Sequence, residues 1–96
     1  MKVDFKKMPQ PDLIFIYIPC RDEAQASAIG QAMVEQKQAA CANIFPTMKS
    51  IYEWEGKICT AQEAVLILKT TADKFTEVEQ AMRKLHSYEV PCIAAL

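Results

Sequence analysis

A long alternation of apolar and polar residues, interrupted once by a glycine, constrains this chain more than any other feature of its sequence. Two largely apolar segments, residues 44–54 and 64–68, flank a polar junction at Glu55, Gly56 and Lys57. Glycine adopts positive φ at no steric cost, and tight strand reversals require that conformation. The pattern therefore predicts a long β-hairpin with Gly56 in its turn.

Two large aromatic residues lie close to the expected tip of this hairpin. Trp54 is the only tryptophan of the chain, and Tyr52 precedes it by two residues. Strand residues two apart project to the same face, so the two rings should lie together. A hairpin tip is far from the core of a small domain. We therefore expect Tyr52 and Trp54 to cover a neighbouring subunit.

The segments around the hairpin predict two helices and two further strands. Residues 13–18 are a continuous run of β-favouring residues that ends at Pro19, as in a central strand covered on both faces. An acidic start followed by small apolar residues at helical spacing predicts a helix over residues 22–38. A second apolar stripe predicts another helix, before a final apolar strand; its members are Phe75, Val78, Met82 and Leu85.

The resulting order of elements is β-α-β-β-α-β. In 96 residues this order predicts an α+β fold of the ferredoxin-like sandwich type, with a long central hairpin. Residues 1–11 are polar, rich in lysine and carry two prolines, so we expect a flexible leader there and a single domain over residues 12–96. Folding at this size removes only about 60% of the unfolded surface, which favours association of subunits.

Two residues inside the expected elements predict local irregularities. Pro46 lacks a backbone donor and therefore indicates an edge strand, a bulge or a bend in the first arm of the hairpin. Gly30 lies inside the first helix, where glycine costs about 1 kcal/mol relative to alanine. It indicates either a close approach of this helix to the sheet or a tolerated glycine.

Composition argues against several classes of function. Eleven basic and twelve acidic residues leave a net charge of −1 without a dense basic run, which argues against a nucleic-acid surface. No apolar run has the length of a membrane span. The chain has one histidine and two glycines, too few for a convincing catalytic triad or a phosphate-binding loop, and we expect no enzyme. Four cysteines without a CxxC pair predict free thiols in a cytoplasmic protein.

Three residues are candidate metal ligands, and each has a second interpretation. Cys41 is either a soft metal ligand or a small residue filling the core. Glu63, beside apolar neighbours, is either a buried acid or the solvated start of a strand. His86 is either a ligand or the C-terminal cap of the second helix. Cys20 and Cys59 have loop-like surroundings, so we expect them to be more reactive than Cys41 if exposed.

Several segments, in this order along residues 13–96, resemble the CutA family of divalent-ion tolerance proteins. The matching residues are Asp22-Glu23, Ala39-Ala40-Cys41-Ala42-Asn43-Ile44 with Pro46, Ser50-Ile51-Tyr52 with Trp54-Glu55-Gly56-Lys57, Glu63, Lys69-Thr70, and His86 with Tyr88-Glu89-Val90-Pro91. The resemblance implies a ferredoxin-like subunit in a tight homotrimer, with hairpin arms that reach across to neighbours and sheets that join edge to edge.

The resemblance also implies a role in copper and divalent-cation tolerance, with no required cofactor and no reaction. Ions would bind near Cys41, Glu63 and His86, close to or between subunits. An alternative is a scaffold resembling the PII signalling trimers, which would bind a small ligand or a protein partner in clefts between subunits. No nucleic acid or membrane is expected as a partner.

Four residues depart from what is usual in the CutA family. Ser87 and Cys92 replace a proline and a glutamate near His86, and Cys59 and Thr60 replace acidic residues after the hairpin turn. The chain therefore has fewer hard oxygen donors and additional thiols. Such an exchange would shift a metal preference toward softer ions such as Cu(I).

Overall fold

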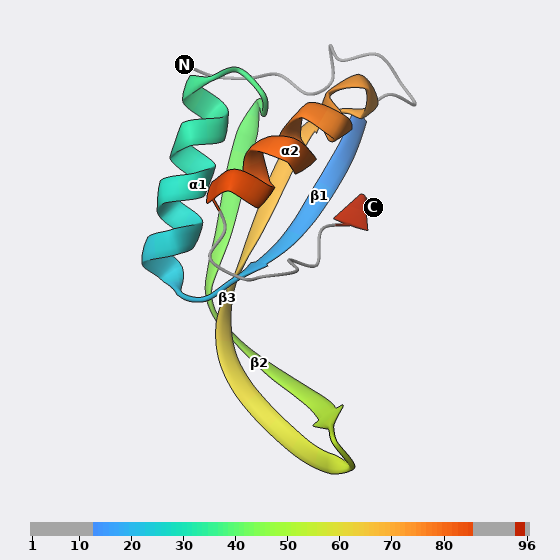
Figure 1. The fold of residues 1–96 in the computed structure, drawn as a ribbon. Helices are drawn as coiled ribbons and strands as arrows, with labels where there is room; N and C mark the ends of the chain where they lie inside the picture. The colour runs from blue at the N-terminus through green and yellow to red at the C-terminus, as the bar shows by residue number, and fades with distance from the viewer. Residues whose placement is uncertain (1–12, 86–93, 96) are drawn as a thin grey trace.

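The structure is a computed structural model that describes residues 13–85 and 94–95 of the chain. The predicted leader, residues 1–11, lies outside the described residues, as do His86, Ser87 and Cys92. The elements follow the predicted order (Figure 1). They are β1 (Leu13–Cys20), α1 (Glu23–Glu35), β2 (Cys41–Trp54), β3 (Lys57–Thr71), a 3-10 turn η2 (Ala72–Lys74), α2 (Phe75–Leu85) and β4 (Ala94–Ala95).

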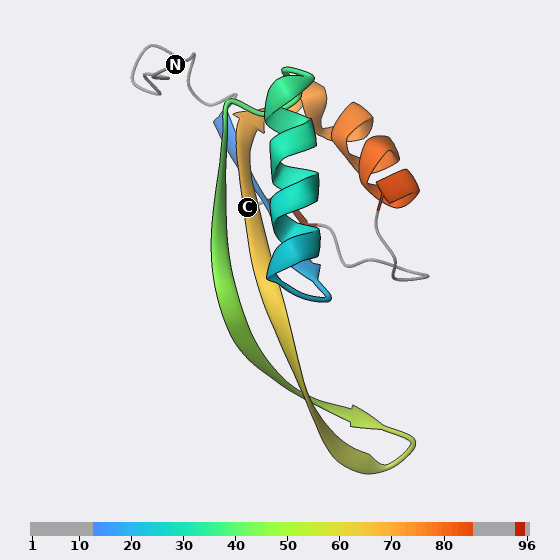
Figure 2. The same cartoon turned by 90° about the vertical axis from the view of Figure 1, so that its left-hand side faces the viewer.

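The strands form one antiparallel sheet in the order β2-β3-β1-β4. Strand β1 therefore lies inside the sheet, as predicted, and the α+β fold with its split βαβ order is confirmed. Both helices lie on the same side of the sheet (Figure 2). The expectation that β1 is covered on both faces is wrong for the described residues, because none of their helices or strands covers the second face.

The core lies between the sheet and the two helices. Alternate residues of β1 and β3 project into it, because successive strand residues point to opposite faces. The helices add one apolar stripe each. The fully buried residues of the core include Ile16, Ile18, Cys20, Ala26, Met33, Ala64, Leu66, Leu68, Val78 and Met82.

Helix α1 is shorter than predicted and is rotated relative to the expected stripe. It ends at Glu35, and Lys37 has a positive φ of 60° in the turn that follows. Ala24 and Ala28, which the sequence places on the apolar face, are exposed. Gly30 explains the position of the helix, since a Cβ built there would lie 3.1 Å from the Cβ of Ala42 on the sheet. The close approach predicted as one alternative for Gly30 is confirmed.

The hairpin of β2 and β3 is the longest feature of the molecule. Its loop is Glu55-Gly56, with φ of 51° and 77°, and both positive values match a two-residue type I′ turn. Strand β1 pairs with β3 only from Ala64 onward, so the distal part of the hairpin projects beyond the sheet as an arm (Figures 1 and 2). We call residues 48–62 the arm; with it the molecule measures 47 × 25 × 22 Å.

A β-bulge marks the root of the arm. Phe45 lies opposite Val65, but Met48 lies opposite Glu63, so Pro46 and Thr47 together face a single residue of β3. The bulge confirms one of the irregularities predicted from Pro46, and β2 is also an edge strand.

Replacing Gly56 with alanine should destabilise the fold through the backbone alone. A Cβ at this position would meet no atom within 4 Å, whereas the φ of +77° disfavours any L side chain by about 1 kcal/mol. We expect Gly56→Ala to lower the thermal unfolding midpoint at fixed protein concentration. Glu55→Asn is the matched control, since asparagine favours positive φ and should leave the midpoint equal or higher. Equal midpoints for Gly56→Ala and wild type would contradict a type I′ turn.

Candidate functional site

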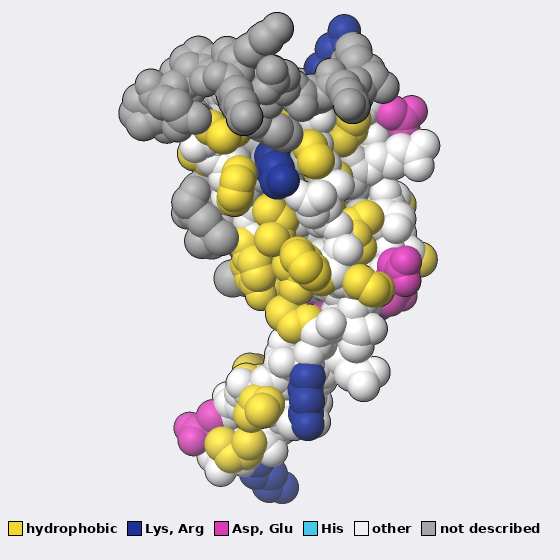
Figure 3. All heavy atoms as spheres, turned by 180° about the vertical axis from the view of Figure 1, so that it is seen from behind, with side chains coloured by type: hydrophobic (Ala, Val, Ile, Leu, Met, Phe, Trp, Pro, Cys, Tyr) yellow, Lys and Arg dark blue, Asp and Glu magenta, His cyan; other side chains and the backbone are white. Residues whose placement is uncertain are grey.

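The side of the sheet opposite the helices carries several partly exposed apolar side chains, Phe15 and Phe45 among them. We call it the open face. Figure 3, which views the molecule from behind the helices, shows hydrophobic side chains gathered over it. The strand register places three cross-strand rows there: Cys41, Lys69 and Phe15; Asn43, Ile67 and Tyr17; and Phe45, Val65 and Pro19.

Cys41 lies on this open face, at the end farthest from the arm, rather than in the core. It is only partly buried, and its cross-strand neighbour is Lys69, whose Nζ lies 5.5 Å from the centre of the Phe15 ring. The interpretation of Cys41 as a core-filling residue is therefore wrong. A partly exposed thiol next to a cation–π pair remains available to a ligand or a partner.

Glu63 lies at the root of the arm, on the same open face. Ser50 Oγ donates a hydrogen bond to Glu63 Oε1 at 2.7 Å, and Met48 is directly opposite Glu63 on β2. Tyr17 Oη donates to Met48 Sδ at 3.3 Å, across the intervening strand β3. We call Tyr17, Met48, Ser50 and Glu63 the root cluster. Glu63 is thus a partly buried, hydrogen-bonded carboxylate, between the two alternatives expected from sequence.

Within the part of one subunit that the structure describes, two of the predicted metal ligands, Cys41 and Glu63, lie far apart. Cys41 lies opposite Lys69, and the six residue-to-residue steps along β3 from Glu63 to Lys69 span about 20 Å. His86 lies outside the described residues. The described part of the chain contains no group of three or more His, Cys, Asp and Glu side chains arranged to hold a metal ion.

The arm is apolar on both of its faces. Tyr52 and Trp54 share one face of the arm, as predicted, and their side chains are 46% and 65% exposed. The register shows that this face continues the open face. The opposite face carries Ile51 and Ile58, at 67% and 71% exposed. Sequence analysis identified the aromatic pair but missed the isoleucines; their alternation with the aromatic residues was the available signal.

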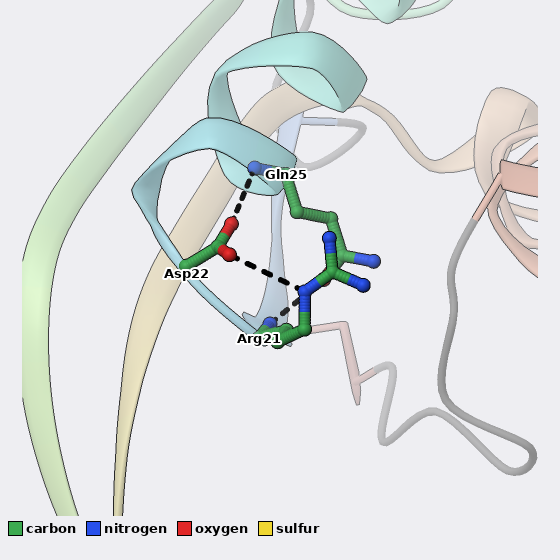
Figure 4. Close-up of polar contacts among 3 residues, drawn as sticks. All are labelled: Arg21, Asp22 and Gln25. Carbon is green, nitrogen blue, oxygen red and sulfur yellow. Dashed lines mark hydrogen bonds and ion pairs between the residues drawn. The ribbon is translucent and has the colours of Figure 1, made fainter.

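A small polar cleft lies at the root of the arm, beside the start of α1. It has a volume of about 180 Å³ and is lined by Arg21, Asp22, Glu23, Pro46, Thr47, Gln62 and Glu63. Asp22 caps the helix by accepting a hydrogen bond from the Gln25 backbone N–H at 2.8 Å (Figure 4). This bond, with the Arg21 guanidinium 3.3 Å away, holds the pKa of Asp22 below its ordinary value.

The sequence matches the family model for the CutA1 divalent ion tolerance protein over residues 14–96. This chain belongs to the CutA family. The divalent-cation tolerance protein CutA of Archaeoglobus fulgidus is 46% identical over 82 residues, which cover 85% of this chain and 79% of the relative. The CutA protein of Thermus thermophilus is 40% identical over 85 residues, which cover 88% and 81%.

The fold agrees with solved CutA structures. The solved structure of the A. fulgidus protein superposes on this chain with a TM-score of 0.82 at 44% sequence identity. The match covers 88% of this chain and 81% of the A. fulgidus chain. Sequence and fold thus both assign the chain to the CutA family. The resemblance inferred from the residues is confirmed.

The prediction of a cytoplasmic location is contradicted by other CutA proteins. The solved A. fulgidus protein is described as periplasmic. An Arabidopsis thaliana CutA protein, 34% identical over 86% of this chain and 46% of its own length, is described as chloroplastic. Free thiols and a near-neutral charge do not determine the compartment.

None of the described helices is long and apolar enough to cross a membrane.

The position of Cys20 also differs from the one expected from sequence. It is the last residue of β1, is fully buried, and its Sγ lies 3.6 Å from the Ile18 carbonyl oxygen. Burial, with the nearby charges of Asp22 and Glu63, raises the pKa of the Cys20 thiol to about 11. The expectation of loop-like surroundings for Cys20 is wrong, because β1 continues to the end of the core. The condition of exposure, on which its greater reactivity depended, is not met.

Thiol labelling can test this assignment. Only the thiolate attacks a disulfide reagent, so Cys20 should not react in the folded protein at neutral pH, whereas the partly exposed Cys41 and Cys59 should react. We expect Cys20 to be modified only after unfolding, with peptide mass spectrometry assigning each site. Labelling of Cys20 as fast as Cys59 in the native protein would contradict its burial.

Proposed function

We propose that this chain forms a homotrimer that acts in divalent-cation tolerance, copper included, and catalyses no reaction. The observation that carries the proposal is the amount of apolar surface that one subunit leaves exposed on the open face and on both faces of the arm. Phe45, Trp54 and Ile58 are all more than half exposed. Exposed apolar patches of this kind mark interaction surfaces.

Unpaired strand edges support the same proposal. The outer edge of β2 has no neighbour among the described strands, and the part of β3 before Ala64 has no neighbour on its β1 side. Long apolar edges promote aggregation unless another chain covers them. Three subunits related by a cyclic axis could pair each arm with a neighbour and close the assembly. Family membership favours this arrangement for the single domain, residues 12–96.

The metal site of the proposal consists of Cys41, Glu63 and His86 and lies at or near the subunit interfaces. Cys41 and Glu63 are too far apart to bind one ion within a subunit, and both lie on the open face that assembly would cover. A ligand set completed by a second subunit is consistent with these two facts. A thiol among the ligands favours copper, as Cu(I), over a hard cation such as Mg²⁺. No cofactor is required.

Truncating the tip of the arm should weaken the assembly. Burial of a tryptophan contributes roughly 2 to 3 kcal/mol, so Trp54→Ala should lower the thermal midpoint or dissociate the trimer in sedimentation velocity. Val34→Ala is the matched control, because Val34 is also exposed and apolar but lies on α1. A wild-type monomer at micromolar concentration, or a Trp54→Ala trimer as heat-stable as wild type, would contradict the assembly.

Copper binding should depend on Cys41 and on assembly. We expect Cys41→Ser and Glu63→Gln to lose most Cu(I) uptake in an anaerobic titration, since each removes a ligand, while Cys59→Ser retains it. Dissociated Trp54→Ala protein should also bind poorly if the site is shared. Full uptake by Cys41→Ser would contradict the proposed ligand set. A folded trimer that binds neither copper nor zinc would instead favour the PII-like scaffold.

A further inference from the structure

The three described methionines differ sharply in exposure. Met33 and Met82 are fully buried in the core, at 0% exposed, whereas Met48 is partly exposed on β2. Oxidation of a thioether requires contact between the sulfur and the oxidant, so an exposed methionine is converted first. Among the described methionines, Met48 is the one that a peroxide in solution can reach.

Met48 lies where a change at its sulfur would affect several neighbouring residues. It is the first paired residue after the bulge, where the arm leaves the sheet. Its sulfur accepts the Tyr17 hydroxyl at 3.3 Å, which links β2 to β1 across β3. Glu63, held by Ser50 at 2.7 Å, lies directly opposite. A change at this sulfur therefore alters the whole root cluster.

Oxidation would introduce a polar group into this surface. Hydrogen peroxide transfers one oxygen atom to the Met48 sulfur: an S=O bond forms, the O–O bond breaks, and water is released. The sulfur loses two electrons and the peroxide gains them. The sulfoxide oxygen only accepts hydrogen bonds, the carboxyl group of Glu63 opposite it already accepts one from Ser50, and the Tyr17 hydroxyl offers a single donor. Covering a polar group without a full set of partners is unfavourable.

We propose that Met48 is an oxidation site and that its sulfoxide keeps the subunit out of the assembly. The second half rests on the proposed function, because it requires that association covers the open face. The reactive species is the free subunit, in which the root cluster is exposed to solvent. Reduction of the sulfoxide by methionine sulfoxide reductases would restore association.

Peptide mapping tests the first half of the proposal. Trypsin cleavage at arginine and lysine places Met33, Met48 and Met82 on three different peptides. The intact chain is incubated with hydrogen peroxide at several protein concentrations, quenched and digested. We expect Met48 to be oxidised roughly tenfold faster than the buried pair, and more slowly as the protein concentration rises. Equal rates for the three methionines would overturn the proposal.

Sedimentation velocity on the same samples tests the second half. The trimer fraction of the wild type should fall as Met48 sulfoxide accumulates and should return after treatment with both sulfoxide reductases. Met48→Leu is the control, because leucine has a similar volume and does not oxidise, while every thiol is kept. Equal dissociation of Met48→Leu would assign the effect to oxidation of another residue and overturn the proposal.

The outcomes separate this inference from the proposed function. An untreated chain that sediments as a monomer contradicts the trimer itself and removes the assembly half of the inference with it. A trimer that persists with Met48 fully converted to the sulfoxide contradicts the inference alone. A trimer in which Met48 never oxidises, even in the most dilute samples, also contradicts it.

Discussion

The pairing of β3 with both β1 and β2 is the interaction on which the rest of this structure depends. Over its C-terminal half β3 has a neighbour on each side, and its residues Leu66 and Leu68 hold the core together under the helices. Over its N-terminal half it has only β2. The same strand therefore belongs first to an exposed arm and then to the centre of a sheet. The unpaired edges and the exposed aromatic residues both follow from this division.

Much of the fold could be predicted because local chemistry determines it. The turn follows from Gly56, and the helix start follows from Asp22, whose carboxylate caps a backbone N–H. The faces of the strands were harder to assign. Where both sides of a strand are apolar, alternation does not reveal which side the helices cover. That is why loop-like surroundings were expected for Cys20, whereas the structure buries it in the core. It is also why core filling was one alternative for Cys41, which lies partly exposed at the start of β2.

The candidate metal site was less predictable than the fold. Cys41 and Glu63 came from a resemblance between sequences, and their separation along β3 depends on the register of the hairpin, which composition does not contain. The root cluster was missed for a related reason. Met48 carries no signal as a single residue, and its significance arises only when the bulge brings it opposite Glu63 and under the Tyr17 hydroxyl. Location was also beyond prediction, because charge and thiol content do not specify a compartment.

The bulge at Pro46 and Thr47 reverses the side of the sheet that the even-numbered residues of β2 face. Ala42 and Ile44 are even-numbered and face the helices, yet Met48, Tyr52 and Trp54 are also even-numbered and lie on the other side. A regular strand would send all five side chains in one direction. One additional residue thus lets a single strand present its even positions first to its own core and then away from it. Removing one residue at the bulge would preserve both orientations, whereas removing one elsewhere in the arm would invert part of the surface.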